Sequence, residues 1–276
     1  MTDKDKVCYH LLRPSQIIDR RKACPIAYIP IGTLEWHGLH NPVGADTLQA
    51  EALAVLCAQK GGLAFPPLYY GESRSESLIE SCDVDREKVA ALMHLDPDNF
   101  AVDKMPFTPM EQIYNYSKLL VHILAEVESL GFKVGVFVAG HYPLIDQARA
   151  AVLHFNKRRY SRYHGMLAWA FTDYLLLKDE YDCAGDHAGG WETSHLLAIC
   201  PESVDLSELG PKNSPLVAVQ GEMSVWDSNA KFGQKTLEMA AEIAVKEAHH
   251  RLNHRDQYMM HGYGLMEGLW KEKALE

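Results

Sequence analysis

Four short apolar runs occur in the first two thirds of the chain, and polar or glycine-containing segments bound each of them. They cover residues 24–32, 62–71, 133–140 and 165–173. Within each run, apolar side chains follow one another almost without a break instead of alternating with polar ones. This pattern is typical of parallel strands that are covered on both faces. The four runs therefore predict a buried parallel sheet.

Helical patterns separate these runs. Residues 46–62 carry apolar side chains at helical spacing and end in glycines, and a longer amphipathic pattern extends from Pro109 to Gly131. Residues 145–159 form a third pattern, whose basic final turn suits the helix dipole, and residues 235–252 form a fourth. Alternating strands and helices predict an α/β fold with helices on both faces of a mainly parallel sheet.

Residues 72–108 interrupt this alternation. They are rich in Ser, Asp and Pro, and they predict a loop-rich, partly structured insertion. In α/β folds, long loops leave the carboxyl ends of the strands, where ligands bind. The chain contains no repeat and no convincing linker, so residues 1–276 are expected to form one domain.

Composition narrows the class of protein. Apolar residues make up 47% of the 276 positions and charged residues 23%, as in ordinary soluble globular proteins. The formal charge of -10 is spread along the chain, which argues against a nucleic-acid surface. Apolar runs of signal-peptide or membrane-spanning length are absent. The six cysteines are scattered without a C-x-x-C pair, which predicts reduced thiols in a cytoplasmic protein.

The stretch "PIGTLEWHGLHNPVGADT", residues 30–47, places polar side chains directly after the first predicted strand. Glu35 and His37 are two residues apart, so in extended backbone they point to the same side. Glycines then let the chain turn, and Asp46 falls at the expected N-cap of the next helix. Singly, these residues read as a solvated carboxylate, a loop histidine and a helix cap. Together they favour a set of oxygen and nitrogen metal ligands.

Two further segments carry candidate chemistry. In "VFVAGHYP", residues 136–143, His141 follows another strand end, and Tyr142 either contacts a substrate or covers the sheet edge. In "GDHAGGWETSHLL", residues 185–197, Asp186 and His187 precede two glycines. Glu192 lies in the first turn of the helix expected there, where it either satisfies the helix N-terminus or acts as a ligand.

Taken in order, the three segments resemble the signatures of the creatininase (creatinine amidohydrolase) family. The family pattern is a Gly-x-x-Glu-x-His-Gly-x-His-Leu-Pro run ending in Asp, then a Gly-His segment, then Asp/Glu-His-Ala-Gly-x-x-Glu-Thr-Ser. The matching segments lie within residues 24–200 of this chain. The resemblance implies a three-layer α/β/α sandwich with a mainly parallel central sheet, assembled as a homo-oligomer, often a hexamer.

The resemblance also implies roles for single residues. It implies a site for two divalent metal ions, with zinc as the first choice and manganese or iron as alternatives. The implied metal ligands are Glu35, His37, Asp46, His141 and Glu192, and Asp46 would bridge the two ions. His187 matches the catalytic or substrate-orienting histidine, and Asp186 stands beside it as a neighbouring acid. Tyr142 matches a residue that lies against substrate.

The implied chemistry is hydrolysis of a small-molecule substrate. Two divalent cations lower the pKa of a shared water, so that hydroxide attacks a carbonyl carbon whose oxygen is polarised. His187 would pass a proton to the leaving atom. This chemistry requires no serine or cysteine nucleophile, and the sequence contains no G-x-S-x-G, H-E-x-x-H or dinucleotide-binding pattern.

This chain departs from the family pattern in several places. Pro143 occupies the position of a glutamate that serves the metal site of creatininase, which argues against creatinine as the substrate. The segment after "YYG" reads "ESRSESLIES", and its Ser73 and Arg74 predict contacts with a polar, hydroxylated or anionic substrate. His40 matches the second histidine of the first motif, whereas Asn41 replaces the usual leucine.

Three functions remain open from the sequence. The leading one is hydrolysis of an amide, either a cyclic amide or a formamide. The second is a carbon–carbon hydrolase that opens a cyclic polyol diketone in inositol degradation, which the polar segment and Pro143 favour slightly. The third is a non-catalytic relative that binds a ligand or partner.

Overall fold

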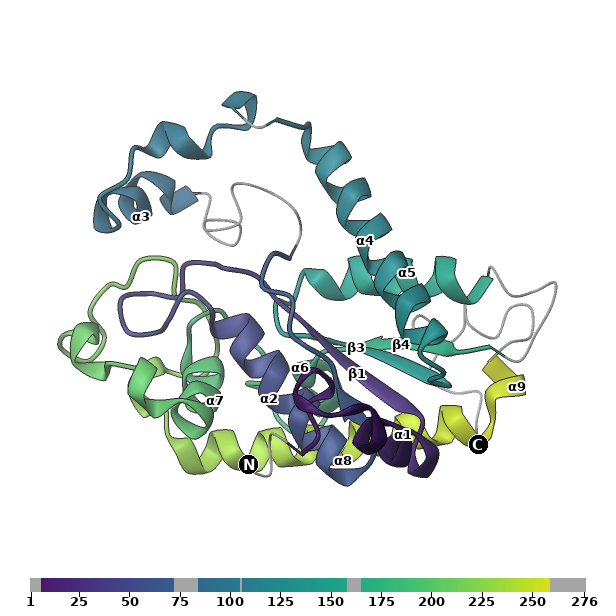
Figure 1. Cartoon of the computed structure of the whole chain (residues 1–276). Coiled ribbons are helices and arrows are strands. Elements are labelled where there is room, and N and C mark those ends of the chain that lie inside the picture. The colour runs from purple at the N-terminus through teal and green to yellow at the C-terminus, as the bar shows by residue number, and fades with distance from the viewer. Residues whose placement is uncertain (1–5, 72–83, 105, 158–164, 259–276) are drawn as a thin grey trace.

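A parallel four-stranded sheet forms the centre of the protein (Figure 1). The computed structural model describes residues 6–71, 84–104, 106–157 and 165–258. The strand order is β2-β1-β3-β4, and every strand residue is buried. The strands are β1 (Ile26–Ile31), β2 (Leu63–Ala64), β3 (Val134–Ala139) and β4 (Leu167–Phe171). The predicted parallel sheet, covered on both faces, is confirmed.

Helices cover the two faces of the sheet and make three layers. Figure 1 shows α4 (Pro109–Ser129) and α5 (Leu144–Lys157) on one side of it. On the other side lie α2 (Ala45–Lys60) and α8 (Ala230–Asn253). A separate apolar cluster fills each of the two interfaces between helices and sheet. The predicted α/β/α sandwich is therefore confirmed.

The predicted strand over residues 62–71 is wrong in its extent. Only Leu63–Ala64 pairs as a strand, with β1. Pro66 and Pro67 follow, and they have no N–H group to donate to a neighbouring strand. The chain returns to the sheet at Leu68, whose N–H donates to the carbonyl of Pro30 at 3.0 Å.

Several shorter helices complete the structure. Helix α1 (Pro14–Ala23) does not follow from the apolar periodicity, because none of its residues is buried. Its Arg20 donates to the carbonyls of Ala58 and Gly62 at the end of α2, and its partly buried Ile17 packs against the edge of the core. The other α-helices are α3 (Arg86–Leu92), α6 (Asp173–Leu177), α7 (Gly190–Ile199) and α9 (Arg255–Tyr258). Short 3-10 turns occur at Tyr9–Leu11, Pro97–Phe100, Val102–Lys104, Pro201–Ser203, Leu206–Leu209 and Val225–Asp227.

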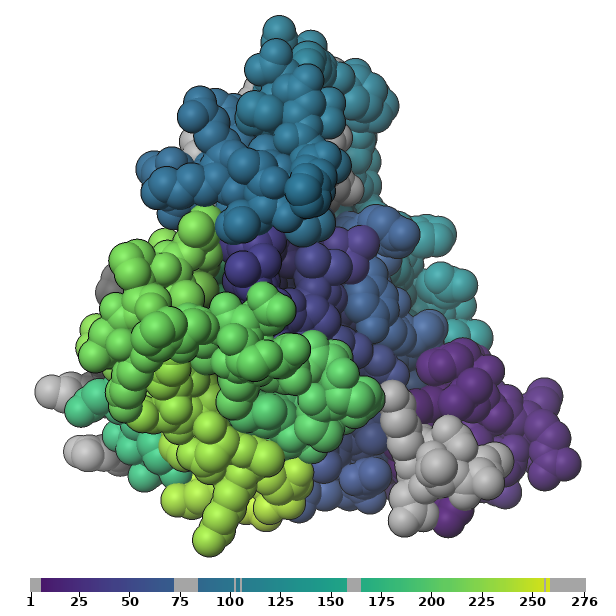
Figure 2. Space-filling view, turned by 90° about the vertical axis from the view of Figure 1, so that its left-hand side faces the viewer, coloured from purple at the N-terminus to yellow at the C-terminus, as the bar shows by residue number. Residues whose placement is uncertain are grey.

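The described part of the predicted insertion, from residue 84 onward, contains α3 and two 3-10 turns. Its Val89 and Phe100 pack with Trp36, which lies between Glu35 and His37. In Figure 2 this segment (blue) forms the top of the face, above the loops of residues 185–225 (green). The insertion therefore covers the loop that carries the first motif. Among the described helices, none is long and apolar enough to cross a membrane.

Two glycines bring the strand ends unusually close to the start of α2. A Cβ added to Gly140, just after β3, would lie 1.9 Å from the carbonyl oxygen of Asp46. A Cβ added to Gly32, just after β1, would lie 2.4 Å from Oγ1 of Thr47. No side chain fits at either position. The first turn of α2 is thereby held against the carboxyl ends of both central strands.

Gly140→Ala tests this constraint. The new methyl group meets backbone, which cannot move aside, so the free energy of unfolding should fall by about 3 kcal/mol, the upper end of the usual cost of overpacking. Gly135→Ala in β3 is the matched control, because its Cβ would meet the flexible end of Met166 at 2.6 Å. Urea unfolding of both variants measures the difference, and equal midpoints would contradict the proposed constraint.

Candidate metal centre

Two loops and two helix starts deliver the candidate ligands to the carboxyl edge of the sheet. Glu35 and His37 come from the loop after β1, and His141 follows β3. Asp46 and Glu192 lie in the first turns of α2 and α7. The predicted N-cap role of Asp46 is wrong: Gly44 is the N-cap residue, and the Asp46 carboxylate contacts histidines instead.

One group of side chains joins Glu35, Asp46 and His141. Nδ1 of His141 lies 3.0 Å from Oε2 of Glu35 and 3.2 Å from Oδ2 of Asp46. All three residues are at most 2% exposed. Two carboxylate oxygens and one imidazole nitrogen therefore converge on one buried point.

A second group joins His37, Asp46 and Glu192. Nε2 of His37 lies 3.0 Å from Oδ1 of Asp46 and 3.4 Å from Oε2 of Glu192. Asp46 thus belongs to both groups and presents one carboxylate oxygen to each. That arrangement is the geometry expected of a bridging carboxylate between two cations.

The hydrogen bonding of His37 shows that a positive charge belongs in this group. Nδ1 of His37 lies 3.1 Å from the carbonyl oxygen of Glu35, which can only accept, so Nδ1 carries the proton. In the neutral ring, Nε2 then offers a lone pair to two carboxylate oxygens, which also carry lone pairs. Burial lowers the pKa of His37, but the Asp46 and Glu192 carboxylates outweigh it and hold the pKa well above its ordinary value. Either a proton or a metal ion must satisfy these atoms.

The donor set fits divalent cations. Buried carboxylates without compensating charge are costly, and three of them, Glu35, Asp46 and Glu192, meet here. Mixed carboxylate and imidazole ligands suit zinc, manganese or iron. In each of the two groups, the ligand atoms lie within 4.8 Å of one another, as they do in a third group formed by Glu35, His37 and His187.

His187 and Tyr142 lie beside the ligands. Nδ1 of His187 is 3.8 Å from Oε2 of Glu35, and the His187 side chain is 13% exposed. Nε2 of His187 and the hydroxyl of Tyr142 are buried and have no hydrogen-bond partner among the described residues. Both atoms can therefore serve a bound molecule. The other predicted substrate contacts, Ser73 and Arg74, lie outside the described residues.

Asp186 supports the start of helix α7. Its carboxylate accepts hydrogen bonds from the backbone N–H of Trp191 at 2.6 Å and of Glu192 at 3.1 Å. Burial and the neighbouring Glu192 carboxylate raise the pKa of Asp186 to about 8. The structure thus gives Asp186 a capping role that fixes Glu192, while its predicted catalytic role stays a prediction.

The segment at residues 217–223 is a part of the site that the sequence did not indicate. Gln220 exchanges two backbone hydrogen bonds with His187, at 2.9 and 2.8 Å. The carbonyl of Val217 accepts from Nε1 of Trp36 at 3.0 Å, and that of Met223 accepts from the N–H of Gly190. This pairing joins residues that are more than thirty positions apart. No local sequence pattern predicts this pairing.

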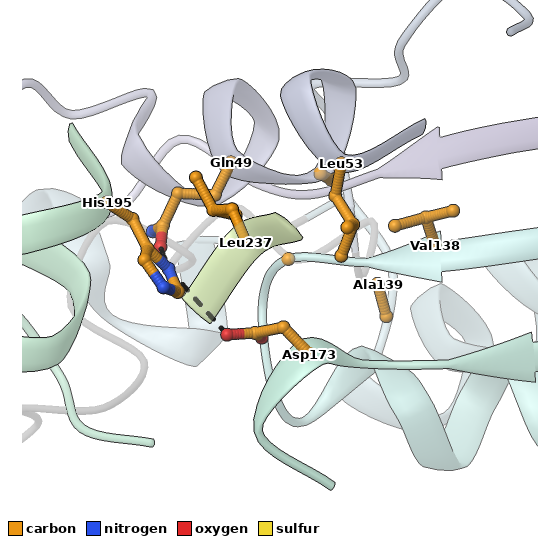
Figure 3. A pocket seen from close by; sticks show the side chains of 9 residues that line it. Gln49, Leu53, Val138, Ala139, Asp173, His195 and Leu237 are labelled. Carbon is orange, nitrogen blue, oxygen red and sulfur yellow. Dashed lines mark hydrogen bonds and ion pairs between the residues drawn. The ribbon is translucent and has the colours of Figure 1, made fainter. Parts of the chain in front are cut away.

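A small cavity lies behind the ligands, between α2, α7 and the end of β3. Figure 3 shows the His195 ring between the amide of Gln49 and the carboxylate of Asp173. His195 Nδ1 is 3.0 Å from Oε1 of Gln49, and Asp173 accepts from Nε1 of Trp191 at 2.8 Å. The cavity of about 10 Å³ has room for roughly one water molecule. This polar network connects the helix of Asp46 with the helix of Glu192.

Asp186→Ala tests the capping role. Loss of the carboxylate leaves two backbone N–H groups of α7 without their acceptor, so the free energy of unfolding should fall by about 1–2 kcal/mol. Urea unfolding in the presence of a chelator measures this without a contribution from metal. The exposed Asp182→Ala is the control. Equal stability of the two variants would contradict the capping role.

Known proteins are similar to this chain in sequence. The family model described as creatininase, creatinine amidohydrolase, matches residues 10–248. A 3-dehydro-scyllo-inosose hydrolase of Thermotoga maritima is 25% identical over 212 residues, which are 71% of this chain and 57% of the relative. The chain therefore spans 57% of the length of this curated relative.

Solved structures share the fold. The crystal structure of a creatinine amidohydrolase has a TM-score of 0.64 at 18% identity, and the match covers 89% of this chain and 98% of that one. A putative creatinine amidohydrolase from Bacteroides fragilis has a TM-score of 0.62 at 17% identity, covering 92% of this chain and 98% of its own. At this level of identity the likeness concerns the fold alone.

Proposed function

The chain belongs to the creatininase family, and from this premise we propose that it is a metal-dependent hydrolase acting on a carbonyl group of a small polar substrate. The observation that carries the proposal is the pair of buried ligand groups that share Asp46. Such a pair is the usual framework for hydrolysis by two metal ions. A non-catalytic, ligand-binding relative would not require two adjacent groups of metal ligands that share one carboxylate.

Each group of ligands would hold one cation. Glu35, His141 and one oxygen of Asp46 would bind the first, and His37, Glu192 and the other oxygen of Asp46 the second. Zinc or manganese is the first choice, since the solved neighbours include a creatininase mutant of "Zn-Zn type" and "Creatininase Mn". When bound, two such ions supply a water of lowered pKa and polarise a carbonyl oxygen.

The side chains around the ligands would do the remaining work. His187 would pass a proton to the leaving atom; in support, its Nε2 is without a protein partner among the described residues and its ring is partly accessible. The Tyr142 hydroxyl would hydrogen-bond to the substrate. Trp36 and the insertion packed on it would keep bulk water away from one side of the site.

Two substrate classes deserve testing. The family description supports a cyclic amide or a formamide. The name of the Thermotoga maritima relative and the Pro143 position support a cyclic polyol diketone, cleaved at a carbon–carbon bond. The attack on a carbonyl is the same in both, and only the leaving atom differs. A homo-oligomer, with the hexamer as one form, and a cytoplasmic location remain predictions.

His187→Gln tests the proton-transfer role. Metal-loaded wild type should hydrolyse a member of one of these classes: formamides, lactams or cyclic polyol ketones. The variant should keep its metal content and lose about 10²- to 10⁴-fold in kcat, the usual contribution of a general acid or base. The exposed His122→Gln on α4 is the control and should match wild type.

Two outcomes would contradict this proposal. A fully metal-loaded wild type that cleaves none of the three compound classes would remove the hydrolase assignment for them. Unchanged kcat in His187→Gln would leave the hydrolase assignment in place but remove His187 from proton transfer.

A further inference from the structure

The turn between His187 and helix α7 contains a residue in an unfavourable conformation. Ala188 is fully buried and has φ of 55°, in the left-handed region that residues other than glycine rarely adopt. Its N–H donates to Oε2 of Glu192 at 2.8 Å. The orientation of the peptide between His187 and Ala188 therefore affects the position of Glu192, a candidate metal ligand. Ala188 is also the direct neighbour of His187.

The side chain of His40 holds the other end of the same residue. Its Nε2 lies 3.0 Å from the carbonyl oxygen of Ala188. Because a carbonyl only accepts, Nε2 must carry the proton and donate it. His40 is 2% exposed and belongs to neither group of ligands that shares Asp46. It comes from the loop after β1, so the hydrogen bond joins the first motif to the third.

Asn41 and Thr193 support this contact. Asn41 Nδ2 donates to Oγ1 of Thr193 at 2.9 Å, and that oxygen lies 3.3 Å from Nε2 of His40. Thr193 directly follows Glu192 on α7. Two neighbouring side chains of the β1 loop thus contact the turn and the first helical residues together.

The His40 ring packs closely against its own loop. It lies over Gly38, where a Cβ would come within 2.6 Å of Nδ1 and 2.7 Å of Cε1. The carbonyl of His40 accepts from the N–H of Asp205 at 2.9 Å, which fixes its backbone as well. The position of the Nε2 proton donor is therefore determined by the loop and not by the turn that it contacts.

We propose that His40, supported by Asn41 and Thr193, is a positioning residue that holds the Ala188 turn and thereby aims Glu192 and His187 at the metal centre. Without the Nε2–H donor, the buried Ala188 carbonyl keeps only the longer contact with the Thr193 hydroxyl, at 3.5 Å, and its left-handed conformation loses a restraint. Relaxation of the φ and ψ angles of Ala188 would then turn its N–H, on the other side of Cα, away from Glu192. The inference rests on the proposed metal centre.

The inference predicts an unequal effect on the two cations. Glu192 belongs only to the group with His37 and Asp46, whereas the group of Glu35, Asp46 and His141 contains no residue of the Ala188 turn or of α7. Removing the Nε2–H donor of His40 should weaken the binding of one cation and leave the binding of the other unchanged. A general loss of stability of the fold would weaken the binding of both cations.

Zinc titration of metal-free protein against a competing chelator tests this. In His40→Leu, one zinc affinity should fall about 10- to 100-fold, as is usual when a partner of a ligand is lost, while the other stays within about threefold of wild type. His40→Gln should restore both affinities, because its amide Nε2–H can donate to the same carbonyl.

A matched control separates positioning from stability. Thr236→Val removes the partner of another buried histidine, His195, whose Nε2 lies 2.9 Å from the Thr236 hydroxyl. This change should lower the melting temperature while both zinc affinities stay unchanged. Should His40→Leu fail to fold, Thr193→Val carries the same test in a milder form, since it removes the hydroxyl that supports His40 and Asn41.

The outcomes distinguish this inference from the proposed function. Two zinc ions bound by wild type with both affinities intact in His40→Leu and Thr193→Val would overturn the positioning role alone. Equal weakening of both sites would overturn it too. Failure of wild type to bind zinc would remove the proposed metal centre and this inference with it.

Discussion

The buried carboxylate of Asp46, placed between His37 and His141, is the interaction on which the site depends. It can occupy that place only because Gly140 and Gly32 let the ends of β3 and β1 approach the first turn of α2. Packing of backbone against backbone therefore sets the position of a charge. That charge, added to those of the other buried carboxylates, must be balanced by protons or by metal ions.

Hydrogen bonds around the ligands determine the directions in which they point. Asp186 fixes the first turn of α7, the backbone of Gln220 fixes His187, and the carbonyl of Glu35 fixes the proton of His37. Because the ligands come from four separate stretches of chain, no one segment could hold the geometry by itself. The long loops after the strands serve this purpose, with the insertion packed on Trp36 above them.

Much of this could be predicted from the sequence, where the signal is local. Unbroken apolar runs predicted the parallel strands, and the spacing of Glu35 and His37 after one of them predicted their convergence. The start of the next helix was predicted two residues too late, with Asp46 instead of Gly44 as the N-cap, because a sequence pattern marks helix ends only weakly. The Gln220 pairing and the strained Ala188 turn escaped prediction because both depend on contacts between distant segments.

The most direct test is the metal content of protein purified without chelator or added metal, measured by elemental analysis for wild type and Asp46→Ala, with the exposed Asp19→Ala as control. A shared bridging carboxylate predicts about two zinc, manganese or iron ions per chain in wild type and in the control, and loss of both in Asp46→Ala. A wild type that holds no such metal, even after reconstitution, would contradict the account.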